Sequence, residues 1–257
     1  MRITAIVNPK GGTGKTTTAV NLAASAALEG KRVLLVDLDK QGSATQWLGH
    51  SPDNDALVRV LVGEILLDSI VIRTDVEGLE LAPASVAIQH ERVTSEPGNQ
   101  YLLREALAKA DERDWVVLDV PGDLGPITIM ALTAATDVLV PVPAGAMELD
   151  EVPKIKETIA KVQARLNEKL TIAGVVLTQV RIFGQHTSVL AREVSDQLRS
   201  DFPDGDLLES FVRDDMRFRE APGARQPMAI YDPGGKGDQD YRKVLAELRD
   251  REVLHVG

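Results

Sequence analysis

The chain has 257 residues, of which 44% are apolar and 26% are charged, and its formal net charge is -10 at neutral pH. This length is enough for one large α/β domain with a substantial core, so we expect residues 1–257 to form a single domain. The absence of cysteine excludes disulfides, iron–sulfur clusters, thiolate metal sites and a cysteine nucleophile. The negative charge argues against a general polyanion binder, so contact with nucleic acid would need a local basic patch.

No apolar run reaches the length of a membrane span, and Met1–Val7 leads directly into a strand-like segment. These features predict a chain without a signal peptide. The simplest interpretation is a cytoplasmic protein.

Along the chain, short apolar runs alternate with longer helical stretches. The expected strands are Ile3–Val7, Arg32–Asp37, Leu79–Ala82, Trp115–Asp119, Asp137–Pro141 and Ile172–Thr178. The expected helices are Lys15–Glu29, Tyr101–Ala110, Ile127–Ala135, Glu148–Leu166, Thr187–Arg199 and Asp240–Arg251. Several strands are almost continuously apolar, which is typical of a parallel sheet covered by helices on both faces. We therefore predict an α/β fold with a doubly wound, mostly parallel sheet.

Turn-rich patches separate these elements. They lie at Ser51–Asp55, Ser95–Asn99, Asp201–Asp206 and Asp232–Asp238. We interpret them as surface loops, because no internal repeat or long low-complexity linker divides the chain.

A glycine-rich loop, Lys10–Thr17, follows the first strand and opens the first helix, which is the context of a P-loop NTPase. Glycines let backbone N–H groups surround phosphate oxygens, and the helix N-terminus adds partial positive charge. Lys15 is expected to reach the β- and γ-phosphates, and the Thr16 hydroxyl to bind Mg²⁺. The expected nucleotide-binding residues are Gly11, Gly12, Thr13, Gly14, Lys15, Thr16 and Thr17. A dinucleotide fingerprint fits poorly, because its third glycine is replaced by Thr17.

Lys10 is a second lysine inside this loop. One nucleotide already has Lys15, so Lys10 could instead reach a phosphate on a facing subunit, as an arginine finger does.

Acidic residues follow two of the expected strands. Asp37 and Asp39 share one face at the end of their strand, where one carboxylate can hold a Mg²⁺-bound water and the other can orient the attacking water. The alternative is a pair of solvated loop acids. Asp119 ends an apolar strand, as the Walker-B aspartate that binds magnesium does. The Gly/Pro loop after it, Val120–Gly125, can sense the γ-phosphate.

Four segments together resemble the ParA/MinD superfamily of P-loop ATPases. Lys10–Thr17 is similar to its deviant Walker-A motif, which is marked by the leading lysine. Asp37–Thr45 resembles the first ParA switch, Asp-x-Asp-Pro-Gln-Gly-Asn-Ala-Thr, and Asp119–Gly122 resembles the second, Asp-Thr-Pro-Pro. Arg217–Gly223 is similar to the ParA segment Arg-Leu-x-Glu-Ala-Pro-Ser. The resemblance covers nearly the whole chain.

The resemblance implies a homodimer that forms in the ATP state, with ATP or ADP and Mg²⁺ as cofactors. Lys10 would touch the partner's nucleotide, and Asp39 would position the attacking water. Thr16, Asp37 and Asp119 are then the expected metal ligands.

The resemblance also implies non-specific DNA binding through basic residues near the C-terminal region, hence a nucleoid-associated protein. The candidates are Arg213, Arg217, Arg219 and Arg225. The alternative is a solvated face in which these arginines form salt bridges with Asp214, Asp215 and Glu220. Family members that regulate transcription often carry an N-terminal helix-turn-helix domain, and this chain is similar to the short form without one.

The chain departs from the family pattern in four places. Pro9 stands for Gln or Gly, Lys40 for the proline of the first switch, and Gly122 for the second proline of the second switch. Val212–Asp215 replaces Ile-Pro-Arg-Asn. The first three departures bear on loop stiffness and hydrolysis rate, and the last on the adenine contacts.

Several functions share this chemistry. The favoured one is a partition ATPase whose slow hydrolysis is stimulated by a ParB-like centromere-binding protein or another cargo adaptor. A positioning ATPase for other cargo is the close alternative. A MinD-like membrane ATPase would need a basic amphipathic C-terminal helix, whereas Tyr241–Arg251 is expected to pack on the core, so no stable membrane association is predicted. An iron-protein reductase is excluded by the missing cysteines, and a metabolic ligase would leave Lys10 unexplained.

Overall fold

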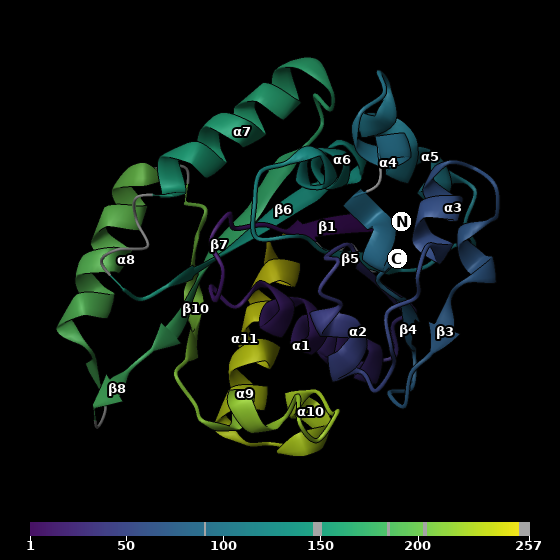
Figure 1. Ribbon diagram of the computed structural model, residues 1–257. Coiled ribbons are helices and arrows are strands. Elements are labelled where there is room, and N and C mark those ends of the chain that lie inside the picture. Colours follow the sequence, from purple (N-terminus) through teal and green to yellow (C-terminus); the bar gives the residue numbers. More distant parts are fainter. Residues whose placement is uncertain (90, 146–150, 184–185, 203–204, 252–257) are drawn as a thin grey trace.

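The computed structural model describes residues 1–257 except 90, 146–150, 184–185, 203–204 and 252–257 (Figure 1). Within the described residues, eight strands form one sheet in the order β10-β7-β6-β1-β5-β2-β4-β3. The strands are β1 (Arg2–Ile6), β2 (Val33–Asp37), β3 (Ile72–Arg73), β4 (Leu79–Ala82), β5 (Trp115–Asp119), β6 (Asp137–Pro143), β7 (Thr171–Val180) and β10 (Leu207–Arg213). All neighbours pair in parallel except β3 and β4. The predicted mostly parallel sheet is confirmed.

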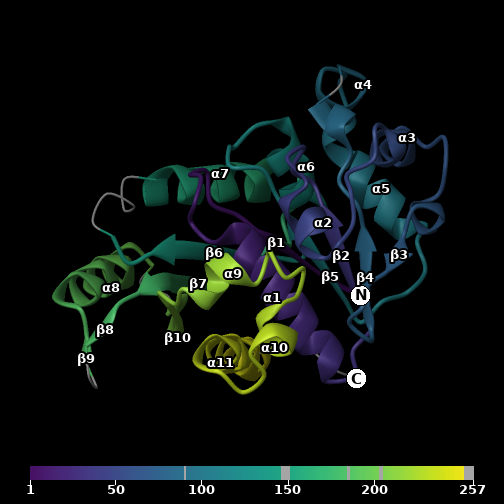
Figure 2. The same cartoon turned by 60° about the horizontal axis from the view of Figure 1, so that its bottom comes forward.

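Helices cover both faces of this sheet. They are α1 (Lys15–Leu28), α2 (Ser43–Trp47), α3 (Ala56–Leu61), α4 (Glu91–Thr94), α5 (Leu102–Ala108), α6 (Pro126–Ala134), α7 (Val152–Arg165), α8 (Val189–Asp201), α9 (Arg217–Glu220), α10 (Met228–Tyr231) and α11 (Lys236–Asp250). Figure 2 shows α1, α10 and α11 on one side of the sheet and α6 and α7 on the other. The short strands β8 (Ile182–Phe183) and β9 (His186–Thr187) pair as a separate hairpin.

The side chains of β5 show why the fold is doubly wound. Trp115 and Val117 join the core on the side of α1 and α11, whereas Val116 and Leu118 join the core on the side of α5 and α6. Alternate residues of a strand point to opposite faces, so a continuously apolar strand needs cover on both.

The position of β1 sets the site. It lies between β6 and β5, and β2 follows β5. Ile6 is in register with Asp119, and Asp119 with Asp37, so the two acids end neighbouring strands at the same edge.

Several elements differ from the sequence prediction. β10 was not predicted, because its middle carries Glu209 and Ser210 and its pairing with β7 is interrupted by register shifts. The short strands β3, β8 and β9 and the short helices α2, α3, α4, α9 and α10 were also missed. The expected start of a helix at Glu148 lies outside the described residues, and α7 begins at Val152 in the part that is described.

The reading of Asp232–Asp238 as a loop was wrong at its end. Helix α11 begins at Lys236, and both Gly237 and Asp238 are buried. A Cβ at Gly237 would lie 2.9 Å from Phe218 and Met228, so the glycine is required for close packing rather than for a turn.

The prediction that Tyr241–Arg251 packs on the core is confirmed, because helix α11 packs on α1 and β10 and buries Tyr241, Val244, Leu245 and Leu248. Trp47 and Trp115 are also buried. Among the described residues, no helix is both long enough and apolar enough to cross a membrane.

Candidate functional site

The phosphate loop joins β1 to α1. Gly12 and Gly14 have φ angles of 76° and 90°, and Gly14 is the N-cap of α1. Left-handed backbone at these points turns successive N–H groups toward one side of the loop, a geometry that glycine adopts without strain. The left-handed conformation of the loop therefore follows from the positions of its glycines.

Neighbouring strands hold the loop in place. The Thr178 hydroxyl donates to the Thr13 carbonyl at 3.0 Å, and the Gln179 amide to the Gly12 carbonyl at 2.6 Å. On the other side, the Asn8 side chain donates to the Pro141 carbonyl and accepts from the Lys10 N–H at 3.0 Å. The loop is thus anchored to β6 and β7 rather than free in solvent.

Lys15 lies folded within this loop. Its ammonium donates to the Lys10 carbonyl at 2.9 Å, and its side chain is largely buried. Burial lowers the pKa of Lys15, while the negative charges of Asp119 and Asp39 act in the opposite direction. A Cβ at Gly122 would lie 3.5 Å from the Lys15 ammonium, so the second switch passes directly beside it.

Asp37 and Asp119 are fully buried at the ends of β2 and β5. Asp37 accepts from the N–H and the hydroxyl of Thr45 at 2.9 and 2.8 Å. Among the described residues, neither carboxylate oxygen of Asp119 has a hydrogen-bond partner at bonding distance. Burial raises the pKa of both carboxyl groups, and for Asp119 the charge of Asp37 raises it further.

This pair fits a cation. Two buried acids side by side repel each other, and an orphaned buried carboxylate is costly unless a positive charge completes it. The hydroxyl of Thr16 and the ammonium of Lys15 only partly offset the rise in the Asp119 pKa. Hard oxygen donors of this kind suit Mg²⁺.

Asp39 differs from Asp37 in its surroundings. It is half-buried and lines the cleft, and its carboxylate accepts from the Gln41 N–H at 2.9 Å. The structure therefore places Asp39 at the cleft beside the phosphate loop and buries Asp37 at the end of β2. The two acids, to which the family resemblance assigns different roles, differ in their surroundings.

A cleft of about 470 Å³ lies above the phosphate loop. One wall is the loop with Asp39 and Gly122, and the other comes from the ends of β7 and β10, the segment after β10, and helices α9 and α11. The residues of this second wall are Thr178, Gln179, Val212, Arg213, Asp214, Asp215, Phe218, Arg219 and Tyr241. The volume is sufficient for a nucleotide.

The sequence analysis named part of this second wall, because Val212–Asp215 and Arg217–Gly223 stood out in the comparison with the family pattern. It did not name Tyr241 as a site residue. The Phe218 ring meets the edge of Tyr241 at 5.7 Å, and the Tyr241 hydroxyl lies 3.2 Å from that of Thr18 in α1. Thr178 could have been found, because it ends a predicted strand at the ligand-binding edge of the sheet. Tyr241 carries no local signal.

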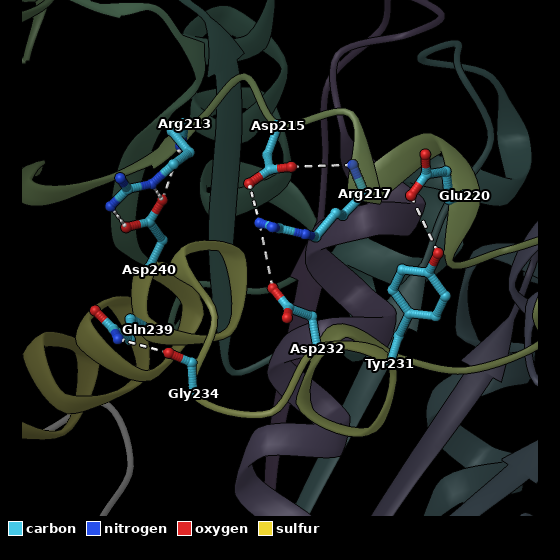
Figure 3. Close-up of polar contacts among 9 residues, drawn as sticks. All are labelled: Arg213, Asp215, Arg217, Glu220, Tyr231, Asp232, Gly234, Gln239 and Asp240. Atoms are coloured by element: carbon cyan, nitrogen blue, oxygen red, sulfur yellow. Dashed lines mark hydrogen bonds and ion pairs between the residues drawn. The ribbon is translucent and has the colours of Figure 1, made fainter.

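Three of the four candidate arginines form ion pairs, and Figure 3 shows those of Arg213 and Arg217. Arg213 binds both oxygens of Asp240 at 2.6 Å. Arg217 lies 3.3 Å from Asp215 and from Asp232.

The other two arginines differ. Arg219 lies 3.1 Å from Asp214. Arg225 is exposed and has no ion pair among the residues that the structure describes. Glu220, which was an expected salt-bridge partner, accepts from the Tyr231 hydroxyl instead.

Comparisons with known proteins find relatives over nearly the whole chain. Residues 1–172 match the family model described as an AAA domain. The chain is 38% identical to the chromosome-partitioning ATPase Soj of Thermus thermophilus, over 98% of this chain and 96% of that protein. It is 34% identical to the chromosome partitioning protein ParA of Caulobacter vibrioides, over 98% and 95% of the two chains.

Two solved structures extend the comparison. A cobyrinic acid a,c-diamide synthase from Mycobacterium smegmatis, bound to ADP and magnesium, has a TM-score of 0.82 at 31% identity, over 98% of this chain and 95% of that one. An ATP complex of McdA from Cyanothece has a TM-score of 0.87 at 19% identity, over 97% and 96%, and shows the fold alone.

Proposed function

This chain belongs to the ParA/MinD family of P-loop ATPases, and we propose that it is a dimerising ATP switch that binds DNA without sequence preference in its ATP state. The observation that carries the proposal is the orphaned Asp119 carboxylate beside Asp37, at the foot of a glycine-rich loop that begins with Lys10. ATP hydrolysis with Mg²⁺ accounts for the buried acids Asp37 and Asp119. A dimer in which each subunit contacts the other's nucleotide accounts for Lys10, the second lysine of the loop.

ATP or ADP binds along the phosphate loop. The N–H groups of Gly11–Thr17 face the phosphates, and Lys15 leaves its contact with the Lys10 carbonyl to neutralise them. Thr16, Asp37 and Asp119 hold Mg²⁺, which supplies charge stabilisation to the phosphate oxygens when bound. The solved relative with ADP and magnesium supports this assignment.

Hydrolysis depends on Asp39. Its carboxylate faces the cleft and can accept a proton or a hydrogen bond from water, whereas the Asp37 carboxylate is enclosed by Thr45. We assign water positioning to Asp39 for this reason. Lys10 supplies a positive charge to the nucleotide of a second copy, as its position at the start of the loop allows.

DNA contact is assigned to the C-terminal basic residues. Arg225 is the strongest candidate, because it is exposed and forms no ion pair with the described residues. Arg217 and Arg219 are themselves exposed and can exchange their single-contact carboxylate partners for phosphates. Arg213 is the weakest candidate, since its bidentate pair with the buried Asp240 would have to break. Such contacts would place the protein on the nucleoid.

A partner protein completes the cycle. We propose a ParB-like centromere-binding protein or another cargo adaptor that stimulates slow hydrolysis, since the relatives at 34–38% identity are named for chromosome partitioning. A membrane-bound alternative has less support, because the apolar face of α11 is buried against α1 and β10.

A small-molecule synthase is the second candidate, because the solved relative at 31% identity has the name of a cobyrinic acid a,c-diamide synthase. Lys10 separates the two functions. A synthase that acts as a single subunit has no use for a second loop lysine, whereas a sandwich dimer does.

The deciding experiment measures binding to non-specific duplex DNA with ATP, with ADP and without nucleotide, at low and moderate salt. We expect the protein to bind DNA only in the presence of ATP. Higher salt should weaken this binding, because a few arginines contact DNA phosphates. Light scattering with ATP should show a dimer for the wild type and a monomer for Lys10→Ala. If Lys10→Ala forms a normal dimer with ATP, Lys10 does not act on the nucleotide of a second subunit. If the wild type binds DNA in none of the three nucleotide states, the proposed DNA switch is wrong.

A further inference from the structure

Arg225 has a left-handed backbone conformation, with a φ angle of 57°. The Gln226 N–H donates to the Ala221 carbonyl and the Arg225 N–H to the Pro222 carbonyl. This is the Schellman pattern that ends a helical turn, and the position of Arg225 in it is normally glycine. A large charged residue at a glycine position is strained, which points to a function for its side chain.

The first switch reaches this arginine through α2. Asp37 binds both the N–H and the hydroxyl of Thr45, so α2 is tied directly to the metal-binding acid. Helix α2 begins after Gly42 and is followed by Gly49, both with left-handed backbone, at φ angles of 64° and 84°. A short helix between two such glycines can pivot as one unit.

The far end of α2 contacts the Arg225 segment. The Trp47 indole, which is only 4% exposed, donates to the Gln226 carbonyl at 2.8 Å. A Cβ at Gly49 would lie 3.7 Å from Cδ of Arg225, so the arginine stem lies against the end of the helix. These contacts join Arg225 and the residue after it to the end of α2, the helix that begins in the first switch.

The phosphate-loop helix provides a fixed anchor for the same segment. The Asn21 amide donates to the Thr17 carbonyl, and its oxygen accepts from the Met228 N–H at 2.7 Å. Met228, at one end of segment 221–228, is therefore held by α1, and Gln226, two residues earlier, is held by α2. A movement of α2 relative to α1 must change the conformation of this segment.

We propose that Trp47 is a positioning residue that couples the first switch to Arg225, so that the nucleotide state sets whether Arg225 is placed to bind a DNA phosphate. This inference rests on the proposed ATP switch and deepens it. Asp37 and Thr45 sense the bound nucleotide and metal, α2 transmits the change, and the Gln226 carbonyl receives it. The two states differ in the Trp47–Gln226 bond, as a physical coupling requires.

The first test is hydrogen exchange of the amides in segment 221–228, with and without ATP and Mg²⁺. In the wild type, ATP should change their exchange by about fivefold or more. Trp47→Phe removes the indole donor and should still bind ATP, with that change reduced to less than about twofold. Trp115→Phe is the matched control, because it also removes one buried indole bond, to the Thr4 hydroxyl, far from the switch.

A second measurement covers the case in which Trp47→Phe does not fold. In Trp115→Phe, Trp47 is the single tryptophan, and its emission should shift on addition of ATP and Mg²⁺ but not of ADP. An unchanged emission would overturn the coupling. An unaltered exchange response in a folded Trp47→Phe would overturn it equally.

DNA binding separates this proposal from the function on which it rests. For a labelled mixed-sequence duplex, Trp47→Phe should lose the difference between ATP and ADP. Arg225→Gly should keep that difference but bind more weakly, with a salt slope lower by about one. An unchanged slope would remove Arg225 from the interface. If ATP changes amide exchange in segment 221–228 but the wild type never binds DNA, the coupling through Trp47 stands and the DNA-binding function is wrong.

Discussion

Buried carboxyl groups at the two ends of the parallel sheet differ in whether they have hydrogen-bond partners within the chain. At the carboxyl end, Asp119 is fully buried and its oxygens have no hydrogen-bond partner among the described residues. At the amino end, Asp137 is equally buried, but Thr4 donates to it at 2.5 Å and Thr136 at 2.8 Å. Burial raises the pKa of both carboxyl groups. The amino end completes its polar groups within the chain, whereas the carboxyl end leaves them for a ligand.

The same contrast holds for the buried cations. The Arg113 guanidinium contacts Asp68 at 2.5 Å and Glu80 at 2.9 Å near the amino end. The Lys15 ammonium donates to a loop carbonyl, a bond that it can exchange for phosphate. At the amino end, the buried charges are paired within the chain and contribute stability. At the carboxyl end, Lys15 and Asp119 would be paired by nucleotide and Mg²⁺, as proposed above.

The largest expected effect comes from removing one cation at each end. Lys15→Ala should weaken ATP binding by at least about 100-fold, since charge-assisted bonds to phosphate are lost, with little change in the melting temperature of the nucleotide-free protein. Arg113→Ala should leave ATP affinity unchanged and lower the free energy of unfolding by about 2–3 kcal/mol, because Asp68 and Glu80 lose their partner. Calorimetric titration and thermal melts measure both. Equal effects of the two variants on ATP affinity would break the comparison.

Next in size is the loss of turnover in Asp39→Ala. ATP binding and dimerisation should persist, while phosphate release falls by about 100-fold, because water is no longer oriented. Asp114→Ala is a suitable control, since Asp114 is an exposed acid whose carboxylate accepts from the Arg32 N–H at the amino end of the sheet. Full turnover by Asp39→Ala would remove its proposed role.

A smaller effect is expected when Asp119 is neutralised. Asp119→Asn should raise the free energy of unfolding of the nucleotide-free protein by about 1–2 kcal/mol, because an uncompensated buried charge is removed. The stabilisation that ATP with Mg²⁺ adds to the melting temperature should shrink in this variant. A lower melting temperature without nucleotide would show that Asp119 is already satisfied within the chain.

The smallest effect is the pH dependence at Asp137. Because its folded pKa is raised, its stabilising contribution is complete below the ordinary carboxyl pKa of about 4 and is lost as pH rises through the folded value. The melting temperature of the wild type relative to Asp137→Asn should therefore fall between pH 4 and 8, by an amount equivalent to about 1 kcal/mol or less. Parallel melting curves across this range would contradict the raised pKa.

The sequence predicted the doubly wound sheet and the phosphate loop because both depend on local pattern. The apolar run of β5 requires cover on two faces wherever it occurs, and glycines at positions 12 and 14 allow left-handed backbone without help from elsewhere. Asp119 was found because it ends such a run. The edge strand β10 was missed because its polar residues interrupt the pattern.

The sequence by itself determined the chemistry of phosphate and metal binding, since the groups concerned are contiguous or end recognisable strands. Only the tertiary structure decided how that chemistry connects to the rest of the molecule. The Trp47 indole donates to the Gln226 carbonyl, 179 residues away in the sequence. Arg213 is paired with Asp240, 27 residues away. The physical reason is that such contacts arise from the packing of α2 and α11 around α1, and no local propensity encodes which distant side chains that packing brings together.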